Sequence, residues 1–313
     1  MKVRRGLSGF ASERGCVLSI GNFDGVHLGH QAMVAKLSKL GARLGLPCVL
    51  LTFEPHPMEL LAPDRAPARL TRFKEKMLAI AQLPAAPDSV VCMRFDEALS
   101  QMPAQEFIAR ILVDGFAVRH LLVGHDFHFG HGGLGNVPLL QTEALARDFE
   151  FECLNTVQNQ GGRVSSTRIR EALMAGELDT ARQLLGRPYS LCGRVGRGQQ
   201  LGRQLGFPTA NIAPGRNRCS IAGVFTVAVH SVSGQHYRGV ANVGKRPTVD
   251  GLEERIEVHL FDFDGDLYGR ELRVEFLSRL RPEQRFNGLE ELTRQIQRDV
   301  QAARDYFETG QQA

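Results

Sequence analysis

Two histidines stand three residues apart where an apolar run gives way to a helical pattern. The stretch GNFDGVHLGH follows CVLSI (16–20) and contains His27 and His30. A helix N-terminus leaves backbone N–H groups unpaired and carries partial positive charge, so it attracts anions. Glycines let the backbone approach a ligand closely, and imidazoles three apart share one helix face. The alternative for one histidine is a helix cap, but the pair predicts a phosphate site.

Two further stretches combine donors with positive charge. In VSSTRIRE, residues 165–168 could bind phosphate at a helix start, or could form an ordinary capped helix. GRVGRGQQLGRQLGFPTANI (193–212) lacks the G-K-S/T of a Walker loop and the third glycine of a dinucleotide fingerprint. Spacing alone indicates a flexible basic loop near the mouth of a barrel, whose N–H groups could form an anion-binding nest.

Composition excludes several classes of protein. The 313 residues are 43% hydrophobic and 23% charged, with net charge +4, which gives no case by itself for nucleic-acid binding. Residues 163–218 hold ten Arg and no Lys, which fits a solvated face or a surface that meets phosphates. Six cysteines form no CxxC pair, so we expect buried free thiols in the reducing cytoplasm. No secretory signal or membrane-spanning run is evident.

The first half alternates short apolar runs with helical periods, which predicts a doubly wound α/β domain with a parallel sheet. Ligands in such sheets lie beyond the carboxyl ends of the strands. After residue 186 the pattern becomes β-like to about 285, with Asp264-Gly265 as a hairpin signal, and ends in a helix from Gly288 to about Phe307. We therefore expect a small β-barrel with a capping helix. Predicted strands are 16–20, 47–53, 89–95, 120–124, 223–229, 236–244, 255–263 and 271–277; predicted helices are 31–45, 72–83 and 103–116.

Several motifs together resemble one family. H-x-G-H is similar to the signature of the nucleotidyltransferase superfamily, and the longer GNFDGVHLGH resembles the adenylyltransferase half of bacterial bifunctional riboflavin kinase/FAD synthetases. TFEPHP (52–57), VGHDFHFGHGGLGN (123–136) and VSSTRIREAL (164–173) resemble later motifs of that half, in the same order. The 193–212 stretch, ANVGKRPTV (241–249) and EVHLFDFDGDLYG (257–269) resemble the riboflavin kinase half. The resemblance implies an adenylyltransferase module over 1–186 and a kinase module over 187–313.

For the first module the resemblance implies transfer of the adenylyl group of ATP to FMN, which gives FAD and pyrophosphate. His27 and His30 would be the catalytic residues. Residues expected to bind ATP or its phosphates are Gly21, Asn22, Phe23, Asp24, Gly29, Ser165, Ser166, Thr167 and Arg168. His56 and Pro57 would line the flavin site, as would Asp126, which could also hold the nucleotide or metal.

One position departs from the family pattern, because the usual D-F-R-F-G has His128 in place of Arg. A fixed positive charge is thereby replaced by a titratable one. His125, His128 and His131 also form an H-x-x-H-x-x-H run, but the surrounding glycines favour a loop over a metal-binding helix face.

For the second module the resemblance implies transfer of the ATP γ-phosphate to riboflavin, which gives FMN. Glu257 would orient the alcohol and take its proton, although pattern alone also fits a solvent-facing edge residue. Thr209 and Asn211 would be ligands of Mg²⁺ or partners of its ligands, and Asn242 would contact flavin. Phosphate would meet Gly196, Gly198, Arg203 and Gly206.

Two other hypotheses remain open at this stage. One module could keep its activity while the other only binds flavin. An RNA-binding role would fit the arginines, but no aromatic residues interleave them and the chain has no Trp. We expect ATP, riboflavin and FMN as small-molecule partners, Mg²⁺ as cofactor, and neither nucleic acid nor membrane; self-association stays open.

Overall fold

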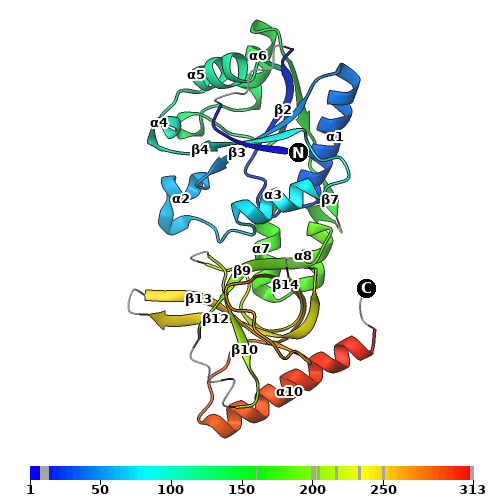
Figure 1. Cartoon of the computed structure of the whole chain (residues 1–313). Coiled ribbons are helices and arrows are strands. Elements are labelled where there is room, and N and C mark those ends of the chain that lie inside the picture. The colour runs from blue at the N-terminus through cyan, green and yellow to red at the C-terminus, as the bar shows by residue number, and fades with distance from the viewer. Residues whose placement is uncertain are drawn as a thin grey trace. The chain divides into compact units, whose positions relative to one another are not determined.

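The chain forms two compact units in this computed structural model (Figure 1). The structure describes residues 1–313 except 8–13, 160, 199–201, 203–204, 216–217, 232–233, 249–250 and 311–313, and only the backbone of 245–248 and 251–253. The first unit comprises residues 1–67 and 73–165, and the second comprises 68–72 and 166–313. The functional boundary at residue 186 stays a prediction.

The first unit is built on a six-stranded sheet in which every neighbouring pair is parallel, with the order β1-β4-β3-β2-β5-β6. The chain winds outward from β2 through β3 to β4 on one side, and from β5 to β6 on the other. The order therefore reverses between β2 and β5, which is where open α/β sheets bind ligands. The strands are β1 (Lys2–Arg5), β2 (Cys16–Ile20), β3 (Cys48–Glu54), β4 (Ser89–Arg94), β5 (Val118–Gly124) and β6 (Glu150–Leu154).

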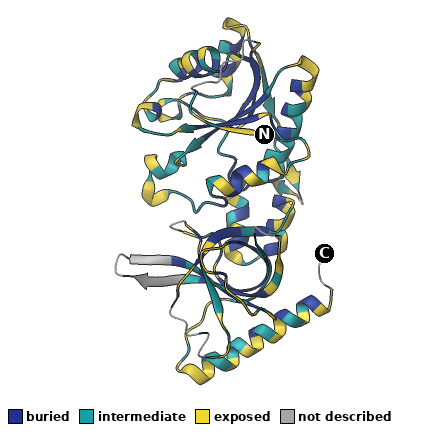
Figure 2. Cartoon of the chain, in the orientation of Figure 1, coloured by how far each residue is buried: buried dark blue, intermediate teal, exposed yellow. Residues whose placement is uncertain are grey.

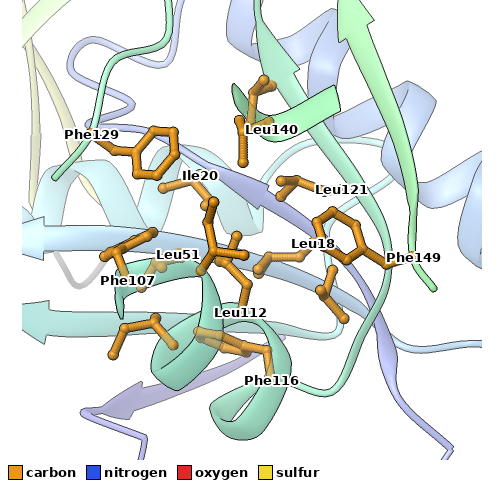
Figure 3. Close-up of a cluster of buried hydrophobic side chains, with 14 of the residues drawn as sticks. Leu18, Ile20, Leu51, Phe107, Leu112, Phe116, Leu121, Phe129, Leu140 and Phe149 are labelled. Atoms are coloured by element: carbon orange, nitrogen blue, oxygen red, sulfur yellow. The ribbon is translucent and has the colours of Figure 1, made fainter. Parts of the chain in front are cut away.

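Apolar side chains cover both faces of this sheet, because successive residues of a strand point to opposite sides. Leu121 joins one buried cluster with residues of α4 to α6 and η2, which Figure 3 shows around Leu18, Leu112 and Phe116. Its neighbour Leu122 joins a second cluster formed with α1 and α3. The helices are α1 (Leu28–Leu44), α2 (Pro57–Leu61), α3 (Phe73–Ala81), α4 (Glu97–Ser100), α5 (Ala104–Glu106) and α6 (Val137–Ala146), with short helices η1 (Pro63–Arg65), η2 (Phe107–Gly115) and η3 (His131–Gly133) and a hairpin β7 (Gln158–Asn159)–β8 (Gly162–Arg163).

The second unit is a closed antiparallel barrel in the order β10-β13-β12-β11-β14-β9. Apolar residues fill its interior, and dark blue marks the buried stretches of the barrel strands in Figure 2. The long helix α10 packs against β11, β12 and β14, held in part by an Arg281–Asp299 ion pair of 2.9 Å. The strands are β9 (Tyr189–Gly196), β10 (Thr209–Ala213), β11 (Gly223–Ser231), β12 (His236–Thr248), β13 (Gly251–Leu260) and β14 (Glu271–Arg281); the helices are α7 (Ser166–Ala175), α8 (Leu178–Leu185) and α10 (Leu289–Glu308).

The predicted architecture is confirmed, but two local predictions need correction. Asp264-Gly265 joins no hairpin, because β13 and β14 are not neighbours in the barrel and the segment between them crosses from one strand to the other. The helix predicted over 103–116 is confirmed, and it consists of a short α5 followed by π-helix η2. The predicted burial of the thiols is right for four of the six free cysteines, whereas Cys153 and Cys219 are half-buried.

Among the described residues, no helix combines the length and apolarity needed to cross a bilayer.

Shortening Leu121 tests whether the first cluster carries the stability of the sheet. Its side chain is fully buried in a central strand, so Leu121→Ala removes buried methyl groups and leaves a cavity, at a cost of about 2–5 kcal/mol. Leu145→Ala is the matched control, because Leu145 is 89% exposed and its loss is expected to cost less than about 0.5 kcal/mol. Urea unfolding followed by circular dichroism compares the two variants; equal midpoints would contradict the packing described here.

Candidate functional site

The loop after β2 reaches α1 through an unusual backbone conformation. Phe23, Gly25 and Val26 have φ angles of 49°, 84° and 45°, in the left-handed region that only glycine enters without strain. Phe23 and Val26 are also buried, with exposed fractions of 1% and 0%, so packing holds the conformation against its cost. Strained residues of this kind concentrate at ligand-binding loops.

His27 and His30 lie together at the start of α1. Their rings stack with centroids 3.6 Å apart and an interplanar angle of 16°, and Phe23 contacts His30 edge-on at 5.2 Å. His27 is the N-cap, and its Nδ1 accepts a hydrogen bond from the backbone N–H of His30 at 3.4 Å. The helix-cap reading and the phosphate-site reading are therefore compatible, because a neutral His27 that accepts at Nδ1 carries its proton on Nε2 and can donate there.

The polypeptide that leads to α7 passes beside this helix start. A Cβ on Gly29 would lie 3.1 Å from the His27 ring and 3.7 Å from the carbonyl oxygen of Val164. Ser165 follows Val164 directly, so the structure brings one of the four predicted phosphate-binding residues of 165–168 toward α1. Ser166, Thr167 and Arg168 begin α7, which belongs to the second unit.

The loop after β3 uses His56 as the N-cap of α2. Its Nδ1 accepts from the N–H of Met58 at 3.2 Å, while the Glu59 carboxylate accepts from the N–H of His56 at 3.2 Å. Pro57 occupies the first helical turn. This capping box orients the imidazole and leaves Nε2 as its second polar atom, so a flavin contact by His56 stays a prediction.

The loop after β5 presents Asp126 with a partner that the sequence did not suggest. Its exposed carboxylate forms an ion pair with Arg163. Desolvation favours the protonated form, but the hydrogen bond and charge of Arg163 outweigh it and hold the pKa of Asp126 below its ordinary value. His128 is exposed, and one of its ring nitrogens contacts the carbonyl of Asp126. No three His, Cys, Asp or Glu side chains of the described residues are grouped as a metal site.

The barrel brings the predicted kinase residues into one row. Glu257 on β13 is paired with Asn211 on β10 and with Asn242 on β12, and Asn211 is paired with Gly196 on β9. Directly paired residues point to the same face, with Cβ atoms about 4.5–5.5 Å apart. Their strand neighbours, such as Ile212 and Ile256, are buried inside the barrel, so this row lies on the outer face, where its members are half-buried or exposed.

Two glycines between β9 and β10, Gly198 and Gly202, lie against two polar residues of β10. A Cβ on Gly198 would lie 2.3–2.5 Å from side-chain atoms of Asn211, and one on Gly202 would lie 3.4 Å from Thr209 Oγ1. Asn211 Oδ1 is buried, and no described group hydrogen-bonds to it. Amide and hydroxyl oxygens are the hard ligands that Mg²⁺ accepts, so this cradle fits the predicted cation. Gly206 has a left-handed φ of 85°, whereas Arg203 lies outside the described residues.

A cavity of about 420 Å³ on the barrel unit was missed by the sequence analysis. The sequence analysis interpreted DFDGD (262–266) only as a turn, but residues of this segment line the cavity. The aromatic spacing in FDFDGDLYG was the available signal. The lining residues are Gln235, Tyr237, Phe263, Gly265, Asp266, Leu267 and Arg270.

Comparisons with known proteins cover both units. Residues 10–168 match the family model described as FAD synthetase, and residues 185–307 match the one described as riboflavin kinase. A crystal structure described as that of a macrolide-efflux protein from Streptococcus pneumoniae has a TM-score of 0.83 and 29% identity, and the match covers 97% of this chain and 99% of that chain.

Curated relatives share nearly the whole length. Proteins named bifunctional riboflavin kinase/FMN adenylyltransferase are 48% identical over 306 residues in Pseudomonas fluorescens, covering 97% of each chain, and 44% identical over 309 residues in Escherichia coli (strain K12), covering 98% of each. The relative of that name from Haemophilus influenzae is 42% identical over 294 residues. The chain therefore belongs to the family of bifunctional riboflavin kinase/FMN adenylyltransferases.

Proposed function

We propose that this chain makes FAD from riboflavin in two ATP-dependent steps, phosphorylation on the barrel and adenylyl transfer at the carboxyl edge of the sheet. The observation that carries the proposal is the start of α1, where the N-terminal end of a helix and two stacked imidazoles lie at the point of strand-order reversal. An anionic substrate suits this position.

In the adenylyl transfer, an oxygen of the FMN phosphate attacks the α-phosphorus of ATP. The bond between that phosphorus and the bridging oxygen to the β-phosphate breaks, and pyrophosphate leaves with the electron pair. The nucleophile is already an anion, so the protein's work is positioning and charge stabilisation. We assign that work to the donors of His27 and His30 and to the N–H groups of the first turn of α1.

In the kinase reaction, the ribityl 5′-hydroxyl of riboflavin attacks the γ-phosphorus of ATP and ADP leaves. The alcohol has to lose its proton, and Glu257 is the carboxylate in the polar row that can orient it and take that proton. Thr209 and Asn211 would hold Mg²⁺, which when bound neutralises phosphate charge. The free thiols support our assignment of both reactions to the reducing cytoplasm.

Separate sites predict separable losses. His27→Asn keeps a good helix cap but removes the imidazole, and Glu257→Gln keeps the shape but removes the base. When riboflavin and MgATP are supplied, we expect His27→Asn to accumulate FMN and Glu257→Gln to form neither FMN nor FAD. When FMN is added instead, we expect Glu257→Gln still to convert it to FAD. Each lost step should fall at least about 10²-fold. Chromatography of the flavins over time measures both rates; loss of both steps in either variant, with FMN supplied for the second, contradicts separate sites.

Removing the amide oxygen of Asn211 tests the proposed cation cradle. Asn211→Leu keeps the volume beside Gly198 but offers no ligand, so we expect the Mg²⁺ concentration for half-maximal kinase rate to rise at least about tenfold. Adenylyl transfer from added FMN on the same chain is the internal control and should not change. An unaltered Mg²⁺ dependence of the kinase would exclude Asn211 from the cation site.

A further inference from the structure

A buried lysine behind the sheet edge takes part in no step described so far. Lys76 lies on α3, and its side chain is only 5% exposed. Transferring an ammonium out of water is costly unless the charge is paired. The described contacts of Lys76 lead to the two loops that carry the predicted adenylyltransferase residues.

One contact leads to the loop before α1. Lys76 Nζ donates to Thr52 Oγ1 at 3.4 Å, and Thr52 Oγ1 donates to the backbone carbonyl of Asn22 at 3.4 Å. A hydroxyl has one donor and can accept at the same time, so the two hydrogen bonds are compatible. Thr52 is fully buried, which shields this link from competing water.

The other contact leads to the loop that contains His56. Lys76 Nζ lies 3.6 Å from Glu54 Oε1, and Glu54 is the last residue of β3. Thr52 and Glu54 are two apart on one strand, so their side chains point to the same face. One ammonium thus joins the carboxyl end of β3 to the loop that follows β2.

We propose that Lys76 is a positioning residue for adenylyl transfer, which fixes the 21–27 loop relative to the 54–57 loop through Thr52 and Glu54. This inference rests on the proposed function of the sheet unit. In this role Lys76 acts through Thr52 and Glu54 and not by binding substrate. An apolar side chain could fill the same space, but it would leave the two loops without their common partner, and misplacing reacting groups by about 1 Å costs about 10²-fold in rate.

The first test replaces the ammonium and reads both activities of the full-length chain. For Lys76→Met we expect kcat for FAD formation from FMN to fall about 10²-fold, with KM for ATP and FMN changed less than about threefold and the riboflavin kinase rate changed less than about twofold. Lys74→Met, on an exposed position of the same helix, is the matched control and should behave as wild type. A kcat within twofold of wild type overturns the proposal.

The second test decides the matter should Lys76→Met fail to fold. Thr52→Val removes the linking hydroxyl and Thr52→Ser keeps it, so we expect the valine variant to lose kcat at least about tenfold and the serine variant to stay within about threefold of wild type. Equal losses in the two variants overturn the proposal. FAD formation by the wild-type protein is measured in parallel, because its absence would refute the proposed function itself.

Discussion

The proposed phosphate site requires the backbone N–H groups at the start of α1 to point beyond the carboxyl edge of the sheet, and much of the sheet unit serves that requirement. Because all six strands are parallel, their carboxyl ends share one edge, and the reversal between β2 and β5 separates the loops there. The loop after β2 then has to turn sharply into the helix. It does so with left-handed residues at Phe23 and Val26, whose burial offsets the steric cost. The packing of Phe23 and Val26 in the core thus maintains the backbone conformation of the loop at the carboxyl edge of the sheet.

In the barrel, as in the sheet, successive residues of a strand point to opposite faces, and this alternation decides where polar side chains can lie. The interior of the barrel is filled by apolar side chains, so the polar residues that we propose to bind substrate stand on the outer face. Three residues on that face are half-buried, so other parts of the chain must pack over them: Asn211, Glu257 and Asn242. Gly198 supplies part of this cover for Asn211, because a Cβ at this position would overlap the Asn211 side chain.

Pattern and motif predicted the architecture well because burial and alternation are local properties of a sequence. Strand β2, helix α1 and helix α10 lie close to their predicted ranges. The edge strand β1 was missed, because KVRR has two exposed charged ends and no apolar run. The hairpin at Asp264-Gly265 was wrong because a turn signal reports only the local backbone and not which strands pair. Similarly, no spacing rule could reveal that Arg163 pairs with Asp126, or that Lys76 reaches Thr52, since these contacts join separate elements.

The different residue types at the two proposed sites follow from their nucleophiles. FMN brings a phosphate that is already ionised, so a site for its adenylylation needs donors that stabilise charge on the phosphates, and the start of α1 offers N–H groups and imidazoles. Riboflavin brings a neutral alcohol, so its phosphorylation needs a proton acceptor as well, and the outer row of the barrel offers Glu257 between two amides. The two modules use the same nucleotide, but their different nucleophiles call for different residue types in the two proposed sites. The helix start supplies fixed donors, whereas the barrel supplies oxygen ligands and a base.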